Sequence, residues 1–429
     1  MKLKQTLAAA GLVAYCATSS AGAPQPFSEE ILDWDDLRAA LRDAGIDLRV
    51  GYVSETATNV QGGGEELWRY TDQWTFLTKF DLQKLLGLNQ AQFVLAITDR
   101  NGRSLSADAN LHSLQQVQEL YGRGQTWRWT EFYYDQSYIG GKLEWRIGRL
   151  PAGDSFAGFS CEFMNLTFCG SPPGNIVGSY WYSWPVSQWA TWVRGNFGGL
   201  GYVQAGAFEV NPSYLETRYA LDLGSPPGAT GVLAPFEIGW LPTFRGLAGS
   251  YKFGGWYSST SAPDVVDNTA GQPLAIDGGE PLVHHGQYGA YVNFLQRLTA
   301  AAGTDSKRGL SVFFNATYAD RRTSTFDSQI AAGLLYTGPF ASRPADLLGF
   351  AVGETHVNSR IADEERLQNF LGVQPVAVQT SEWVSEVFYN VHVSHWLDLR
   401  PNVQYVLHPG GTAANAGDLI VGVRLAINL

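Results

Sequence analysis

The chain lacks long apolar runs, although it is rich in apolar residues. Hydrophobic residues make up 45% of the 429 residues. Beyond the N-terminal leader, however, no segment approaches the roughly eighteen consecutive apolar residues that a membrane-spanning helix needs. This pattern excludes helical insertion into a membrane. The hydrophobicity is instead dispersed at every second position, which is how a membrane-spanning strand carries it.

Positive charge and cysteine are also scarce. The formal net charge is −11 at pH 7, which argues against nucleic acid and against an anionic membrane surface as partners. Of the 3 cysteines, Cys16 lies in the leader, so Cys161 and Cys169 remain in the mature chain. An exported protein can keep a disulfide, and we predict that these two cysteines form one.

Recognisable catalytic and metal-binding motifs are missing as well. The sequence contains no G-x-S-x-G elbow, P-loop or dinucleotide fingerprint in its strand and helix context. His392 and His395 are three residues apart on a predicted strand, so they face opposite sides and make a poor metal pair. We therefore expect no metal, no cofactor and no catalytic residue. A pair of catalytic carboxylates stays open, because spacing in sequence says little about their spacing in space.

The first 23 residues have the pattern of a secretory signal peptide. Lys2 and Lys4 precede an apolar run, and small residues follow. Cleavage after Ala21 and cleavage after Ala23 both fit the pattern. The expected location of the mature chain is therefore outside the cytoplasm.

A short helical segment follows the leader. Asp33 can cap a helix and Gly45 can end it, so we predict a periplasmic helical segment over 24–48. The remaining residues, 49–429, are predicted to form one barrel domain.

The end of the chain shows the alternation that governs the rest. Val403 and Tyr405 fall on one face of an extended segment, while Asn402 and Gln404 fall on the other. A soluble β-sandwich and a membrane barrel both predict this period of two. The polar faces are dense with charge in strand after strand, which favours a barrel with an apolar outer side and a polar lumen.

The same alternation predicts an all-β fold: a transmembrane antiparallel up-and-down β-barrel of about sixteen strands. Long linkers alternate with short turns, which places both termini on the short-turn, periplasmic side. The predicted strands lie near 49–59, 70–82, 91–100, 127–138, 142–150, 188–196, 200–210, 232–241, 247–258, 286–298, 309–321, 327–337, 346–356, 380–394, 397–408 and 417–427.

Residues 127–154 hold the strongest candidates for a functional site. The alternation places charged side chains of two neighbouring strands on the predicted lumen face, and the longest loop, 151–187, begins beside them. This loop is either an exposed cap or a segment that folds into the lumen and narrows the pore. The predicted pore-constriction residues are Glu131, Asp135, Arg146, Arg149 and Asp154, with Arg100, Glu382 and Glu386 as the next candidates.

Arg128 does not fit a strict alternation, because it shares the parity of Phe132 on the apolar face. Two explanations are open. Arg128 lies above the membrane edge, or a β-bulge shifts the phase of the strand.

Four stretches carry a resemblance to a known family. GRLPAGDSFAGFSCEFMNLTFCGSPPGN, YWYSWPVSQWATWVRG and YVQAGAFEVNPSYL resemble the carbohydrate-selective porins of the OprB family, and WTEFYYDQSYIGGKLEWRIGRL is similar to them too. The likeness covers nearly all of the mature chain. It implies a sixteen-stranded barrel in the outer membrane of a Gram-negative bacterium, with a constriction built by inward-folded loops.

The resemblance also implies a function: passive diffusion of monosaccharides and other small carbohydrates. The expected partners are small, glucose-like sugars, outer-membrane lipid and lipopolysaccharide, and the barrel-assembly machinery. The oligomeric state stays open. The alternatives are a porin for other solutes, such as organic acids, and an outer-membrane enzyme that acts on glycans.

Overall fold

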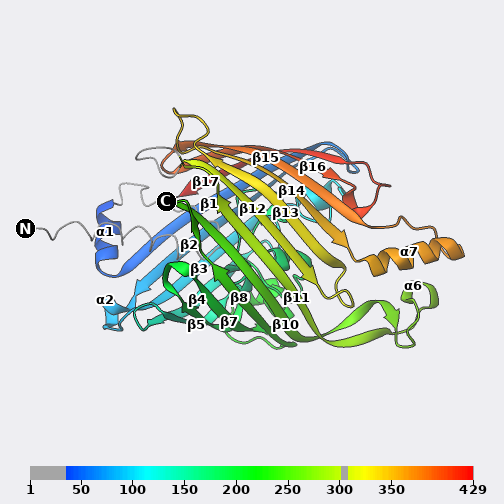
Figure 1. The fold of residues 1–429 in the computed structure, drawn as a ribbon, viewed down its shortest axis with the longest axis horizontal. Coiled ribbons are helices and arrows are strands. Elements are labelled where there is room, and N and C mark those ends of the chain that lie inside the picture. Colours follow the sequence, from blue (N-terminus) through cyan, green and yellow to red (C-terminus); the bar gives the residue numbers. More distant parts are fainter. Residues whose placement is uncertain (1–34, 301–307, 429) are drawn as a thin grey trace, which may run out of the picture.

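The chain forms a closed antiparallel barrel whose strands follow one another around the wall (Figure 1). The computed structural model describes residues 35–300 and 308–428. Wall strands adjacent in sequence are paired, and β17 closes the sheet by pairing with β1. Closure leaves no free sheet edge, as a sheet in lipid requires. The predicted barrel is therefore confirmed.

In the described residues, sixteen long strands build the wall, as predicted, and the short strand β9 lies in the turn between β8 and β10. The strands are β1 (Ile46–Gln61), β2 (Trp68–Asp81), β3 (Ala91–Gly102), β4 (Trp127–Tyr138), β5 (Leu143–Leu150), β6 (Gln188–Asn196), β7 (Gly201–Val210), β8 (Gly231–Trp240), β9 (Thr243–Phe244), β10 (Leu247–Asn268), β11 (Pro281–Arg297), β12 (Gly309–Ala319), β13 (Phe326–Thr337), β14 (Leu347–Val357), β15 (Ser381–Ser394), β16 (Leu397–Leu407) and β17 (Asp418–Asn428).

Side chains alternate between a polar interior and an apolar exterior. On β16, Asn402 and Gln404 are buried, whereas Val403 and Tyr405 are each 40% exposed. In a soluble protein the apolar face of a strand is buried and the polar face is exposed, whereas here the arrangement is reversed. The outer face is therefore suited to lipid, and the inner face to a hydrated lumen.

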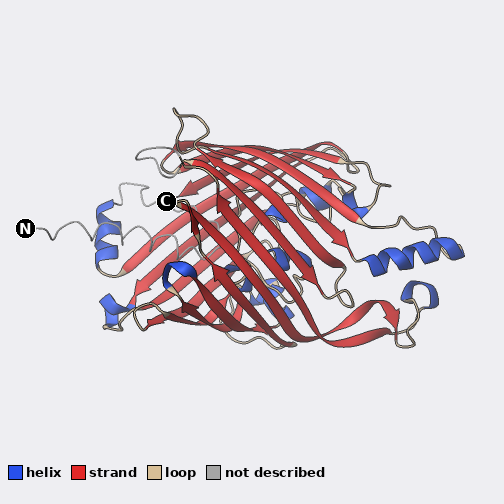
Figure 2. Cartoon of the chain, in the orientation of Figure 1, coloured by secondary structure: helices blue, strands red, loops and turns tan. Residues whose placement is uncertain are grey.

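The helices lie at the two ends of the barrel and inside it (Figure 2). In Figure 1, α1 and α2 lie at the end where β17 finishes, and α6 and α7 lie at the opposite end. The α-helices are α1 (Asp35–Asp43), α2 (Leu82–Leu86), α3 (Leu105–Asp108), α4 (Ala152–Ser155), α5 (Pro172–Ile176), α6 (Leu274–Asp277) and α7 (Ser359–Leu371). The short 3-10 helices are η1 (Leu166–Phe168), η2 (Gly198–Leu200), η3 (Pro212–Leu215), η4 (Thr217–Tyr219) and η5 (Pro409–Gly411). No helix of the described ranges is long and apolar enough to cross a membrane.

The predicted N-terminal helix is present as α1, and Gly45 follows it with a φ of 94°. Only glycine adopts this left-handed backbone readily. The predicted signal peptide, its cleavage sites, Cys16 and the capping residue Asp33 lie outside the described residues.

The strand pair β10 and β11 extends well beyond the predicted bounds of 247–258 and 286–298. Register shifts interrupt the pairing between Ser258 and Ser261 and again between Pro263 and Asn268. Beyond these shifts the side chains no longer alternate regularly between the two faces, and this alternation is what predicted the first part of the hairpin. The sequence pattern therefore ended before the strands did.

Helix α7 lies in the predicted linker 357–379. Its N-cap residue is Asn358, whose side chain accepts a hydrogen bond from the Arg360 backbone N–H at 3.1 Å. The Arg360 guanidinium then pairs with Asp264 at 2.9 Å and with Asp267 at 2.8 Å. These ion pairs join residues that are far apart in sequence and stabilise a polar helix. The helix has no apolar stripe, so the sequence pattern did not predict it.

Candidate functional site

Two long segments fold into the barrel and lie against its inner wall: loop 103–126, between β3 and β4, and loop 151–187, between β5 and β6 (Figure 2). Loop 151–187 contacts the wall through aromatic rings. The ring of Phe163 lies 4.9 Å from that of Phe388, and the ring of Phe159 lies 4.7 Å from that of Phe313. Edge and tilted contacts of this kind are favourable beyond the area that they bury.

The predicted site residues Glu386 and Glu382 hold these loops in place. Both Glu386 carboxylate oxygens accept backbone hydrogen bonds, from Met164 at 2.9 Å and from Asn165 at 2.8 Å. Glu382 accepts one from the backbone N–H of Leu114 at 2.7 Å. Irregular backbone inside a barrel must find such partners. These two carboxylates therefore bind the loops rather than lie free in the channel.

A second carboxylate of the wall supports loop 151–187 on the opposite side. Glu237 of β8 accepts a hydrogen bond from the backbone N–H of Ala157 at 2.8 Å. Next to it, the Lys252 ammonium donates to the backbone carbonyl of Gly158 at 2.6 Å. Anions of the wall thus bind loop N–H groups, and a cation of the wall binds a loop carbonyl.

Loop 103–126 is held by a buried group of four alternating charges, which we call the charge quartet: Arg100, Glu119, Arg424 and Glu55. Arg424 donates to Glu55 at 3.0 Å and to Glu119 at 2.8 Å. The guanidinium of Arg100, another predicted site residue, lies 3.9 Å from the Glu119 carboxylate. Glu119 belongs to the loop and the other three to the wall, so the quartet joins the two.

An ion pair at the rim adds a further link. Asp108 of α3 pairs with Arg69 of β2 and, at 2.8 Å, with Arg103. The hydrogen bond from Arg69 lowers the pKa of the Asp108 carboxyl below its ordinary value. The carboxylate is therefore charged at neutral pH and keeps the start of the loop on the wall.

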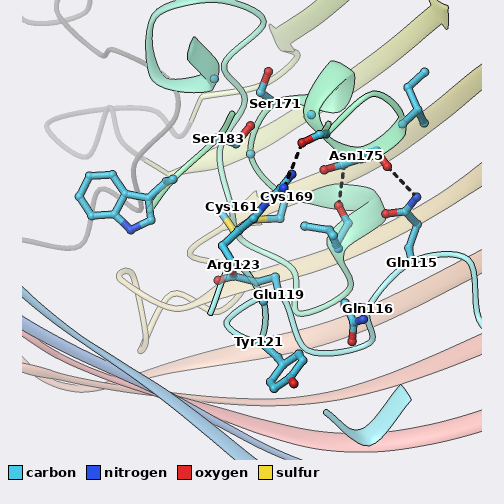
Figure 3. Close-up of a pocket in the computed structure, with 18 of the residues that line it drawn as sticks. Gln115, Gln116, Glu119, Tyr121, Arg123, Cys161, Cys169, Ser171, Asn175 and Ser183 are labelled. Carbon is cyan, nitrogen blue, oxygen red and sulfur yellow. Dashed lines mark hydrogen bonds between the residues drawn. A yellow bond between two sulfur atoms is a disulfide. The ribbon is translucent and has the colours of Figure 1, made fainter. Parts of the chain in front are cut away.

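A cavity of about 580 Å³ lies between the two inner loops (Figure 3). It is lined by amides, guanidinium groups, hydroxyls and aromatic rings rather than by aliphatic side chains alone. Gln115 donates to the backbone carbonyl of Asn175 at 3.2 Å and so joins one loop to the other. Further lining residues are Arg100, Glu119, Tyr121, Arg123, Asp154, Ser171, Ser183 and Trp184.

Three predicted site residues lie on the wall strands β4 and β5. Asp135 and Arg146 form an ion pair of 2.7 Å between β4 and β5. The Arg146 guanidinium also lies over the ring of Trp192, 4.8 Å from its centroid. The charge of Glu131 reaches Arg146 and Asp154. The structure therefore brings Glu131, Asp135, Arg146 and Asp154 into one neighbourhood.

Arg149 is placed differently from these residues. Arg149 follows Arg146 by three positions on β5, so the two side chains point to opposite faces of the strand. The Arg149 guanidinium lies over the ring of Tyr214, 4.3 Å from its centroid. Its two terminal nitrogens donate to the backbone carbonyls of Asp222 at 2.9 Å and Ser187 at 3.0 Å. Arg149 therefore supports loop 211–230 at the rim instead of joining the neighbourhood of Arg146.

The conflict at Arg128 is resolved by a β-bulge. The pairing of β3 with β4 skips Thr130, because Ala96 is opposite Glu131 and Ile97 is opposite Trp129. The bulge shifts the phase within β4, so that Arg128 is buried inside although it shares the parity of Phe132.

Cys161 and Cys169 are joined in a disulfide within loop 151–187, with Cα atoms 4.2 Å apart. Among the described residues, Glu119 and these two cysteines are the one group of three potential metal ligands that comes together. Because both sulfurs are bonded to each other, neither can act as a thiolate ligand.

Sequence reasoning missed Glu55, Glu119, Glu237, Arg123 and Arg424 as site residues. A signal existed for Glu237, because it lies between the apolar Phe236 and Ile238 on a strand. Glu119 and Arg123 lie in an irregular loop, where no periodicity indicates which way a side chain points.

Comparison with known proteins gives a consistent result. Residues 65–429 match the model of the carbohydrate-selective porin, OprB family. Porin B of Pseudomonas aeruginosa is 39% identical, over 95% of this chain and 93% of its own length. The putative porin QuiX of Acinetobacter baylyi is 32% identical, over 92% of each chain. A high-pH structure of Pseudomonas putida OprB superimposes with a TM-score of 0.89 at 41% identity, covering 92% of this chain and 97% of the other.

Proposed function

Because the chain belongs to the carbohydrate-selective porins of the OprB family, we propose that it lets monosaccharides and other small sugars diffuse through a constriction formed by loops 103–126 and 151–187. Family and fold place it in the outer membrane of a Gram-negative bacterium. The end of the barrel that carries α1 faces the periplasm in this proposal, since short turns lie at that end.

The observation that carries the proposal is the chemistry of the cavity between the loops. A sugar offers hydroxyls in all directions and flat C–H faces, so it is matched by planar donors and acceptors beside aromatic rings. Gln115, Asn175 and Arg123 supply the planar groups, and Tyr121 and Trp184 supply the rings. The cavity volume of about 580 Å³ falls in the range of about 300 to 1,000 Å³ typical of small-molecule sites.

Diffusion through such a passage needs no chemical step. A sugar entering the cavity exchanges hydrogen bonds to water for hydrogen bonds to the lining, at little net cost in free energy. Opposite charges on the wall of the passage, Arg146 and Asp135 among them, offer donors and acceptors together. A ring of one sign would favour ions over neutral sugars. The relatives in the comparison are porins, which favours conduction over glycan hydrolysis.

The proposal predicts that glucose blocks the ion current through single channels in planar bilayers. Replacing Glu131 by glutamine should raise the glucose concentration for half-block by about threefold to tenfold, because a sugar hydroxyl loses a charged acceptor. Glu280→Gln serves as the control, since Glu280 lies exposed outside the lumen. No block by glucose in the parent protein would contradict the proposed function. Equal block in the parent and Glu131→Gln would remove Glu131 from the site.

A further inference from the structure

An apolar groove of about 420 Å³ lies on the outer, lipid-facing side of the wall. It is lined by Phe76, Ile97, Trp127, Trp129 and Leu221. Strand β3 begins after α2, which lies at the α1 end of the barrel, so β3 ends and β4 begins at the opposite end (Figure 1). Because Trp127 is the first residue of β4, the groove lies near this opposite end, at the level of the outer leaflet.

One edge of the groove is formed by loop 211–230, which folds over the rim onto the outer wall. The indole N–H of Trp129 donates to the backbone carbonyl of Leu221 at 2.9 Å. The backbone N–H of Trp129 donates to the carbonyl of Ala220 at 3.0 Å. An N–H group that faces lipid needs such an acceptor. These two bonds hold Leu221 beside the wall, so the groove has a fixed edge.

Polar side chains continue from the groove toward the rim on the same outer face. Asp99 follows Ile97 by two residues on β3 and is paired with Trp127 across the sheet. The amide of Asn101 donates to Asp99 at 2.9 Å and to Asp72 of β2 at 3.4 Å. A carboxylate can accept about four hydrogen bonds, so acceptor positions remain for a ligand. Charged side chains on a lipid face are least costly at the level of the headgroups.

A guanidinium lies at the rim beside these carboxylates. The backbone N–H of Arg103 donates to the carbonyl of Tyr70 at 3.1 Å, which holds Arg103 next to β2. Its side chain is 69% exposed and pairs at 2.8 Å with Asp108, a carboxylate that Arg69 also binds. A guanidinium has five N–H donors. Arg103 therefore keeps donors for a further anion, and phosphate is the anion that its planar group suits.

We propose that this face binds a phosphorylated glycolipid of the outer leaflet. An acyl chain fills the groove, hydroxyl or amide N–H groups of the headgroup donate to Asp72 and Asp99, and a phosphate pairs with Arg103. The groove is continuous with the lipid-facing wall, which favours an acyl chain as the occupant. Acceptors beside an exposed cation complement a headgroup that carries both donors and phosphates. This binding site is outside the lumen and independent of the passage of sugars.

The test measures binding of purified rough lipopolysaccharide, and separately of phosphatidylethanolamine, to the detergent-solubilised full chain by native mass spectrometry. The parent protein should bind lipopolysaccharide more tightly than the phospholipid. Leu221→Asn should weaken its affinity for lipopolysaccharide by about threefold to tenfold, because apolar contact at the edge of the groove is lost. Arg103→Gln should weaken it by about threefold, the loss expected for one exposed ion pair.

Two matched variants serve as controls and should bind lipopolysaccharide like the parent. Leu298→Asn changes an exposed leucine that follows β11 at the α1 end, and Arg366→Gln changes an exposed arginine of α7. Equal affinity of the parent for the two lipids would overturn the inference, as would parent affinity in both Leu221→Asn and Arg103→Gln. If these two variants instead change the oligomeric state and keep the lipopolysaccharide, the groove binds a second copy of the chain and the inference is wrong. A shift of gel mobility on boiling shows that each variant is folded.

Discussion

Replacing Glu386 by alanine is expected to release loop 151–187 from the wall, to raise single-channel conductance and to abolish block by sugar. The buried carboxylate accepts hydrogen bonds from the N–H groups of Met164 and Asn165. Without it, both groups are left buried and unsatisfied, at a cost to the docked loop of about 2 to 6 kcal/mol. A cost of this size is enough to make an undocked loop abundant.

Two variants serve as controls for this result. Glu386→Gln keeps the shape and one acceptor oxygen, so it should fall between the parent and the alanine variant. Glu354→Ala removes a carboxylate of the neighbouring strand β14 that bonds to the Ser381 hydroxyl at 2.6 Å rather than to a loop. Glu354→Ala should conduct like the parent. If Glu386→Ala also conducts and is blocked like the parent, the carboxylate does not hold the loop.

Replacing Arg424 by methionine is expected to have the second large effect. The replacement leaves the two buried carboxylates of Glu55 and Glu119 with Arg100, 3.9 Å from Glu119, as the remaining cation of the quartet, and breaking a buried pair in this way costs about 3 to 5 kcal/mol. The repulsion should detach loop 103–126, because Glu119 is the one member of the quartet that belongs to a loop. We expect noisy, larger currents and a lower temperature for the change of gel mobility.

A compensating variant makes this prediction specific. Adding Glu55→Gln to Arg424→Met leaves Arg100 and Glu119 as one balanced pair, so conductance and thermal stability should move back toward the parent values. If the double variant is no better than Arg424→Met alone, the effect comes from lost packing of the arginine stem and not from the charge quartet.

The sequence was sufficient to predict the wall of the barrel. Alternation is a local property of a strand, so Asn402 and Gln404 could be assigned to the lumen and Val403 and Tyr405 to the lipid without knowing any partner. The bulge beside Arg128 was foreseen as one of two explanations, because a charged residue on an apolar face is itself a local conflict.

The roles of the inner residues could not be predicted in the same way. Glu386 and the backbone of Met164 are 222 residues apart in sequence, and Glu55 and Arg424 are 369 apart. Such contacts depend on how irregular loops fold back, which no periodicity encodes. The alternation placed Glu386 correctly in the lumen, but only the structure shows that its acceptors are used by a loop.

Arg149 shows the limit of reading charge alone. Its position at the root of the longest loop predicted a place at the pore, yet its parity on β5 sends it to the opposite side from Arg146. The alternation alone predicts the opposite faces, since Arg149 lies three residues after Arg146. A charged residue at a strand end can instead be satisfied by a loop that folds over the rim.

The central claim is that loops held to the wall by buried carboxylates make the passage narrow and selective for sugars. The most direct test is swelling of proteoliposomes in a panel of sugars from a hexose to a trisaccharide, with the parent protein and Glu386→Ala side by side. The account predicts fast entry of the hexose and strong retardation of the trisaccharide in the parent, with the difference largely lost in the variant. Equal size dependence in both proteins, or no size dependence in the parent, would contradict it.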